Sequence, residues 1–99
     1  MINNVVLVGR LVRNPELKYS ASGVAIARFT VAVNRTFGQD KETDFINCIA
    51  FKKTAENLTN FTGKGSLIGL EGRIQTGSYE NAEGKKVFTT DILANSVQF

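Results

Sequence analysis

Aromatic and basic side chains in neighbouring positions are the residues of this chain that could do chemistry. The aromatic candidates are Phe37, Phe45, Phe51 and Tyr79, and the basic residues near them in sequence are Arg35, Lys41, Lys52, Lys53 and Arg73. Such a set suits single-stranded nucleic acid, because bases stack on aromatic rings for about 1–3 kcal/mol each while Lys and Arg follow the phosphates. Basic groups alone would hold duplex and single strand alike, so the aromatic rings favour the single strand.

Each aromatic candidate also has a purely structural interpretation. Phe45 and Phe51 lie in a predicted strand, where a phenylalanine is more often part of the core. Tyr79 stands near a predicted hairpin end and could be an edge tyrosine with its hydroxyl in water. Phe37 lies in a polar loop and is harder to assign to a core. The residue pattern by itself leaves stacking platform and core packing both open.

Composition excludes several kinds of active site. The 99 residues carry a net charge of +3, which permits nucleic acid as a partner without requiring it. The chain has no histidine and one cysteine, so histidine bases and Cys/His zinc sites are excluded. We see no catalytic constellation of carboxylates, Lys or Tyr, and we predict neither enzyme activity nor a cofactor. No apolar run reaches membrane-spanning length, and the unpaired Cys48 agrees with a reducing compartment, so a cytoplasmic protein is predicted.

Residues 44–51 are the strand that would position most of the candidates. Alternation places Phe45, Asn47, Ile49 and Phe51 on one face and Ile46, Cys48 and Ala50 on the other. The second set is uninterrupted, small and apolar, which is typical of a core face.

Four more strands, one short extended segment and one helix are predicted around it. The strands are residues 4–11, 24–35, 66–80 and 86–99, the extended segment is 16–20, and the helix is 53–62. Residues 4–11 are apolar on both faces and are expected to be buried on both, by the barrel and by a neighbouring subunit. In the helix, Ala55, Leu58 and Phe61 form an apolar stripe, Thr54 is the candidate N-cap and Gly63 the left-handed C-terminal residue.

Five strongly coiled strands with a helix between the third and fourth fit an all-β OB-fold, a five-stranded Greek-key barrel. Other small β-barrels fit the same pattern. Residues 1–99 contain no repeat, low-complexity segment or linker, so one domain is predicted.

Ordered segments over almost the whole chain resemble the bacterial and phage single-stranded DNA-binding proteins. They are NVVLVGRL (4–11), NPELKY (14–19), FTVAVNR (29–35), DFINC (44–48), AEN (55–57), KGSL (64–67), EGRIQT (71–76), YEN (79–81) and SVQF (96–99). The resemblance implies an OB-fold, a homotetramer, and sequence-independent binding of single-stranded DNA in replication, recombination or repair.

The resemblance also implies roles for individual residues. The stacking positions correspond to Phe37, Phe45, Phe51 and Tyr79, with Asn47 as a hydrogen-bonding residue on the same side. The basic contacts correspond to Arg35, Lys53, Lys64 and Arg73, and Lys41 joins them by its place near Phe37. On this basis Phe45, Asn47 and Phe51 are assigned to the DNA side, and Ile46, Cys48 and Ala50 to the inner side.

Two departures from the family pattern qualify these expectations. Gln75 and Gly77 stand where many members have arginines, which weakens the predicted phosphate track there. Members generally continue into a flexible linker and an acidic tip that recruits other proteins, whereas this sequence ends at Phe99, so tail-mediated partners are not expected. The alternative function is that of an OB domain acting as an oligomeric interaction adaptor, and an enzyme is a more distant third.

Overall fold

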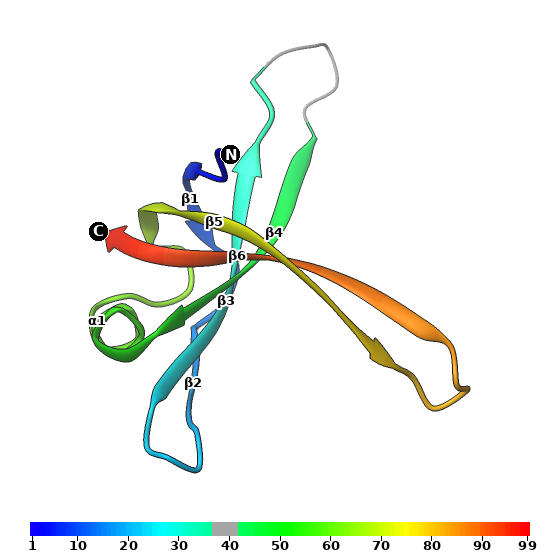
Figure 1. Cartoon of the computed structure of the whole chain (residues 1–99). Coiled ribbons are helices and arrows are strands. Elements are labelled where there is room, and N and C mark those ends of the chain that lie inside the picture. The colour runs from blue at the N-terminus through cyan, green and yellow to red at the C-terminus, as the bar shows by residue number, and fades with distance from the viewer. Residues whose placement is uncertain (37–41) are drawn as a thin grey trace.

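Six strands and one helix make up the computed structural model of the chain, which describes residues 1–36 and 42–99 (Figure 1). The elements are β1 (Val5–Leu11), β2 (Glu16–Tyr19), β3 (Ala25–Asn34), β4 (Thr43–Phe51), α1 (Lys52–Phe61), β5 (Leu67–Glu80) and β6 (Lys86–Gln98). Within the described residues, α1 is the one helix, and it is too short to span a membrane.

A closed ring of five strands forms the barrel. The strands run in the order β1-β5-β6-β4-β3, and pairing of β1 with β3 closes the ring. All pairings are antiparallel except that of β4 with β6. This confirms the predicted five-stranded OB-fold barrel with its helix between the third and fourth barrel strands. The predicted extended segment forms β2, which adds to the free side of β3.

The interior of the barrel is filled by one side of each strand. The buried apolar residues are Leu11, Ala25, Ala27, Phe29, Val31, Cys48, Ala50, Ala55, Leu58, Ile68, Leu70, Ile92 and Ala94. In β4, and in β3 except at the buried Thr30, the buried residues alternate with outward-facing ones, as the period of a strand requires. The helix α1 contributes Ala55 and Leu58 and packs mainly against β3.

The ends of the helix differ from the prediction. It begins at Lys52, and Phe51 rather than Thr54 is the N-cap, without a side-chain cap hydrogen bond. Lys52 adopts a φ of 58°, which turns the chain from β4 straight into the helix and leaves no room for a separate cap residue. At the other end the helix closes with Thr62 in extended conformation, so Gly63 is not left-handed.

Phe61 departs from the predicted apolar stripe. Its side chain is 69% exposed, and its ring stacks on that of Phe99 with centroids 5.9 Å apart. Phe61 is therefore not part of the buried stripe, and its ring meets Phe99 near the end of the chain.

Two glycines mark places where strands approach too closely for a side chain. A Cβ on Gly9 would lie 2.4 Å from the carbonyl oxygen of Ala32, next to Arg10, which pairs with both β5 and β3. A Cβ on Gly72 would lie 2.0 Å from the carbonyl oxygen of Leu93, beside a bulge in the β5–β6 ladder. Glycine within a strand commonly accompanies a bulge, and Gly72 does so here.

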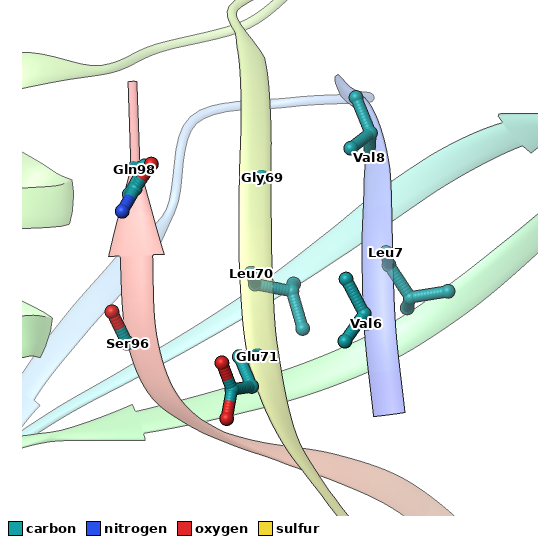
Figure 2. A pocket seen from close by; sticks show the side chains of 8 residues that line it. All are labelled: Val6, Leu7, Val8, Gly69, Leu70, Glu71, Ser96 and Gln98. Carbon is teal, nitrogen blue, oxygen red and sulfur yellow. The ribbon is translucent and has the colours of Figure 1, made fainter. Parts of the chain in front are cut away.

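The outer face of β1 is not covered by the chain itself. Leu11 is buried and Leu7 packs against the core, but Val6 and Val8 are more than 60% exposed. These two valines lie beside a hollow of about 250 Å³ that extends over β5 and β6 to Glu71, Ser96 and Gln98, and Figure 2 shows the side chains that line it. The barrel thus covers one face of β1, as predicted, and burial of the other face by a neighbouring subunit stays a prediction.

Candidate nucleic-acid interface

The outer face of β4 presents two aromatic rings to solvent. Phe45 is 67% exposed and Phe51 is 38% exposed, and Asn47 lies between them on the same face. Cys48 and Ala50 point inward and are buried. The predicted division of this strand into an outer and an inner face is thus the one observed.

A row of side chains crosses the outer face of the sheet over five strands. The register pairs Glu16 with Arg28, Arg28 with Ile49, Ile49 with Leu93, and Leu93 with Arg73. Directly paired residues share one face of a sheet. Two arginines therefore lie on either side of a short apolar centre, which is formed by Ile49 and Leu93.

Three adjoining hollows meet at Arg28 and form what we call the outer groove. One, of about 150 Å³, is lined by Arg28, Ile49, Phe51, Gln75, Thr76, Gly77, Thr89 and Asp91. The second, of about 200 Å³, shares Arg28 and Asp91 and adds Arg13, Glu16, Phe29, Thr30, Asn47 and Cys48. The third, of about 290 Å³, lies along β2 and is lined by Glu16, Lys18, Tyr19, Ser20, Ile26 and Arg28. Arg28 is the residue common to all three.

The hairpin of β5 and β6 forms one wall of this groove and carries Tyr79. Side chains two positions apart on a strand share a face. Tyr79 therefore continues the face that holds Gln75 and Gly77, which line the groove, and its ring is exposed. Arg73 belongs to the same face by the same rule. The groove thus continues from the barrel onto the hairpin.

A chain of hydrogen bonds orients Asn47. The guanidinium of Arg13 donates from Nη2 to Thr30 Oγ1 at 3.4 Å, and the Thr30 hydroxyl donates to Asn47 Oδ1 at 3.1 Å. Because Oδ1 already accepts this bond, the two N–H groups of the Asn47 amide are left to donate to a ligand. Asn47 itself is exposed, so these donors are accessible.

Arg35 is bound by acidic neighbours in the free chain. Its guanidinium contacts Glu42 and Asp44, each with a closest N–O distance of 2.8 Å. The hydrogen bond with Arg35 lowers the pKa of the Asp44 carboxyl and raises that of the guanidinium. A phosphate that approached Arg35 would therefore compete with two carboxylates.

Cys48 does not take part in the groove as a reactive group. Burial, together with the negative charge of Asp91, raises the pKa of its thiol to about 12. The thiolate is the nucleophilic form of cysteine, so the side chain behaves as a small apolar core residue.

The remaining predicted site residues lie elsewhere or outside the description. Lys53 on α1 and Lys64 between α1 and β5 are exposed, but neither lines the outer groove. Phe37 and Lys41 fall outside the described residues. The structure therefore brings together Phe51, Asn47, Tyr79 and Arg73 around the groove, with Phe45 farther along the same face of β4.

Arg28, Thr30 and Asp91 line the groove although the sequence did not single them out. The alternation of β3 places Arg28 and Thr30 on its polar face and is a signal that could have found them. Asp91 reaches the groove through the pairing of β6 with β4, whose paired residues are 44 positions apart in sequence. No local pattern contains that pairing.

Comparison with known proteins agrees with this geometry. Residues 2–99 match the family described as the single-strand binding protein family. The chain is 58% identical to the "Single-stranded DNA-binding protein" of Halalkalibacterium halodurans, with all of this chain and 61% of that protein covered. It is 55% identical to "Single-stranded DNA-binding protein A" of Bacillus subtilis, covering all of this chain and 59% of that protein. The chain spans about three-fifths of the length of these relatives.

Proposed function

Since the chain belongs to the single-strand binding protein family, we propose that it binds single-stranded DNA without sequence preference. Its setting would be replication, recombination or repair in the cytoplasm, and residues 1–99 would act as one OB-fold binding domain. The observation that carries the proposal is the exposure of Phe45 and Phe51 on the outer face of β4, on either side of Asn47. Large rings exposed on a polar face are costly to leave in water and suit the stacking of bases.

In the proposed mode of binding, bases stack on Phe45, Phe51 and Tyr79 while the backbone follows the outer groove. Every base has an aromatic face, so stacking tolerates any sequence. The Asn47 amide would donate to base oxygens or ring nitrogens, and Arg28 and Arg73 would neutralise phosphates near the apolar centre. Lys53 and Lys64, and Phe37 with Lys41 and Arg35, would extend the contact beyond the groove.

The charge of the groove sets the balance between stacking and electrostatics. Arg13, Lys18 and Arg28 line it, but so do Glu16 and Asp91, and Gln75 and Gly77 add no charge. Few phosphates can therefore be neutralised inside the groove. We infer that stacking provides most of the affinity there and that the salt dependence of binding is modest.

Assembly into a homotetramer is part of the proposal. Val6 and Val8 expose an aliphatic strip on β1, with no aromatic or basic residue in the adjoining hollow (Figure 2). Such a strip suits contact with another copy of the chain better than contact with DNA. The same strip would serve the alternative function of an oligomeric interaction adaptor.

Binding of labelled oligo-dT and of a duplex of equal length, measured by fluorescence anisotropy at several salt concentrations, tests the proposal. Oligo-dT should bind more tightly, and its affinity should fall with salt at a log–log slope of about −0.7 for each phosphate neutralised. Arg28→Gln should reduce the size of that slope by about one such step. Equal affinity for duplex would contradict the proposal. A stable oligomer that bound no single strand would favour the adaptor.

A further inference from the structure

The outer half of the β5–β6 hairpin is a two-stranded ribbon with both faces in solvent. Beyond Gly72, β5 no longer pairs with β1, and β6 pairs with β4 only from Ile92 onward. Figure 1 shows this ribbon, olive and orange, projecting away from the barrel. Every residue from 73 to 80 is exposed. Side chains on either face are therefore free to bind.

The two faces of the ribbon each carry one aromatic ring. Tyr79 is paired with Val87 and lies on the face that continues the outer groove. Phe88 is paired with Ser78 and lies on the opposite face. Phe88 is 77% exposed, more than Phe45 or Tyr79, and no part of the proposed groove includes it. A ring so exposed at the end of a projecting ribbon has no packing role in the chain.

A lysine accompanies this ring. The ammonium of Lys86 lies 5.5 Å from the centroid of the Phe88 ring, within the range of a cation–π contact. An aromatic ring with a mobile cation beside it is the combination by which proteins hold a nucleotide, ring against base and cation against phosphate. The hollow beside the valine strip on β1 has no aromatic ring and no basic residue. The chemistry of this face thus points to nucleic acid rather than to another protein chain.

We propose that Phe88 and Lys86 form a second contact site for single-stranded DNA, on the face of the hairpin opposite Tyr79. A base stacks on Phe88, and the Lys86 ammonium moves from the ring to the adjoining phosphate. A strand that leaves Tyr79 reaches Phe88 around an edge of the ribbon, since neither edge pairs there with another described strand. The site presupposes the proposed function and lengthens the DNA that one chain contacts.

Photo-cross-linking with oligo-dT that carries 5-iododeoxyuridine in place of thymidine tests this site directly. Cleavage after Arg73, Lys85 and Lys86 by trypsin places Tyr79 in peptide 74–85 and Phe88 in peptide 87–99. Cross-links are expected in both peptides, with fragment spectra locating the second at Phe88. A cross-link confined to peptide 74–85 would overturn the second site while upholding the groove. Absence of any binding would instead refute the proposed function.

Affinity measurements with matched variants distinguish DNA contact from protein contact. Phe88→Leu keeps an apolar side chain but removes the ring, and should weaken binding of a long oligo-dT about fivefold, the lower end of a stacking contact. Binding of an oligonucleotide too short to leave the groove should be unchanged. Phe61→Leu, at a ring of similar exposure on α1, should change neither. Unchanged affinity together with a smaller oligomer mass for Phe88→Leu would overturn the proposal in favour of a protein contact.

Discussion

Replacement of Phe45 by alanine should lower both the stability of the fold and the affinity for single-stranded DNA, and the two losses can be measured independently. The ring is 67% exposed, so about a third of its surface is buried. A fully buried aromatic side chain covers about 150–250 Å², and a third of that, at about 25 cal/mol per Å², amounts to about 1–2 kcal/mol of unfolding free energy. Loss of one stacked base costs about 1–3 kcal/mol of binding, or about 5- to 150-fold in Kd.

Phe61→Ala is the matched control for this experiment. Phe61 has almost the same exposure, 69%, but lies on α1 against Phe99, away from the groove. Both variants should lower the midpoint of urea unfolding by similar amounts. Only Phe45→Ala should raise the Kd for oligo-dT, measured by anisotropy at a temperature where both variants are folded. Equal Kd values for the two variants would refute the assignment of Phe45 as a stacking platform.

Three further predictions concern backbone packing, the thiol and charge. Gly72→Ala should destabilise the fold by about 1–3 kcal/mol or more, because the added Cβ would clash with the backbone of β6. Gly69→Ala is the control, because a Cβ there meets only ordinary contacts and should be tolerated. Urea unfolding of the two variants measures the difference. The raised pKa of the Cys48 thiol stabilises the folded state below about pH 9, and this contribution should be lost as pH rises from 9.0 towards about 12. Over that window the midpoint of urea unfolding should fall less for Cys48→Ala than for the unmodified protein. Asp44→Asn should release Arg35 from its ion pair with Asp44 and tighten oligo-dT binding at low salt. The gain should vanish at high salt, where the charge of Arg35 is screened. No gain at low salt would show that Arg35 does not contact DNA.

Much of the site was predictable because it depends on the alternation of one strand. The side chains of residues 44–51 point to opposite faces in turn, and the faces observed for Phe45, Asn47, Cys48 and Ala50 follow from that rule. Periodicity in the sequence also predicted the strands of the barrel and the helix. The resemblance to a family added the preference for stacking over core at Phe45 and Phe51, which alternation had left open.

Features at the junctions of elements were predicted less well. The helix start depended on a left-handed Lys52, a conformation that residue type does not favour. Phe61 continued a helical stripe in the sequence, but in the fold its side chain is exposed and its ring stacks on Phe99 instead of packing in the core. In both places the neighbouring elements, rather than the local pattern, set the outcome.

The sequence by itself determined which side chains could stack, which could carry charge and which faces of each strand they would share, because these follow from residue type and a period of two. Only the tertiary structure decided which strands lie side by side. These pairings place Arg28 where three hollows meet, and they place Asp91 next to Cys48 in the groove. They also leave Val6, Val8 and Phe88 exposed. The physical reason is that closing the barrel joins strands far apart in the chain, and the register of those pairings is set by packing and close backbone approach rather than by any local run of residues.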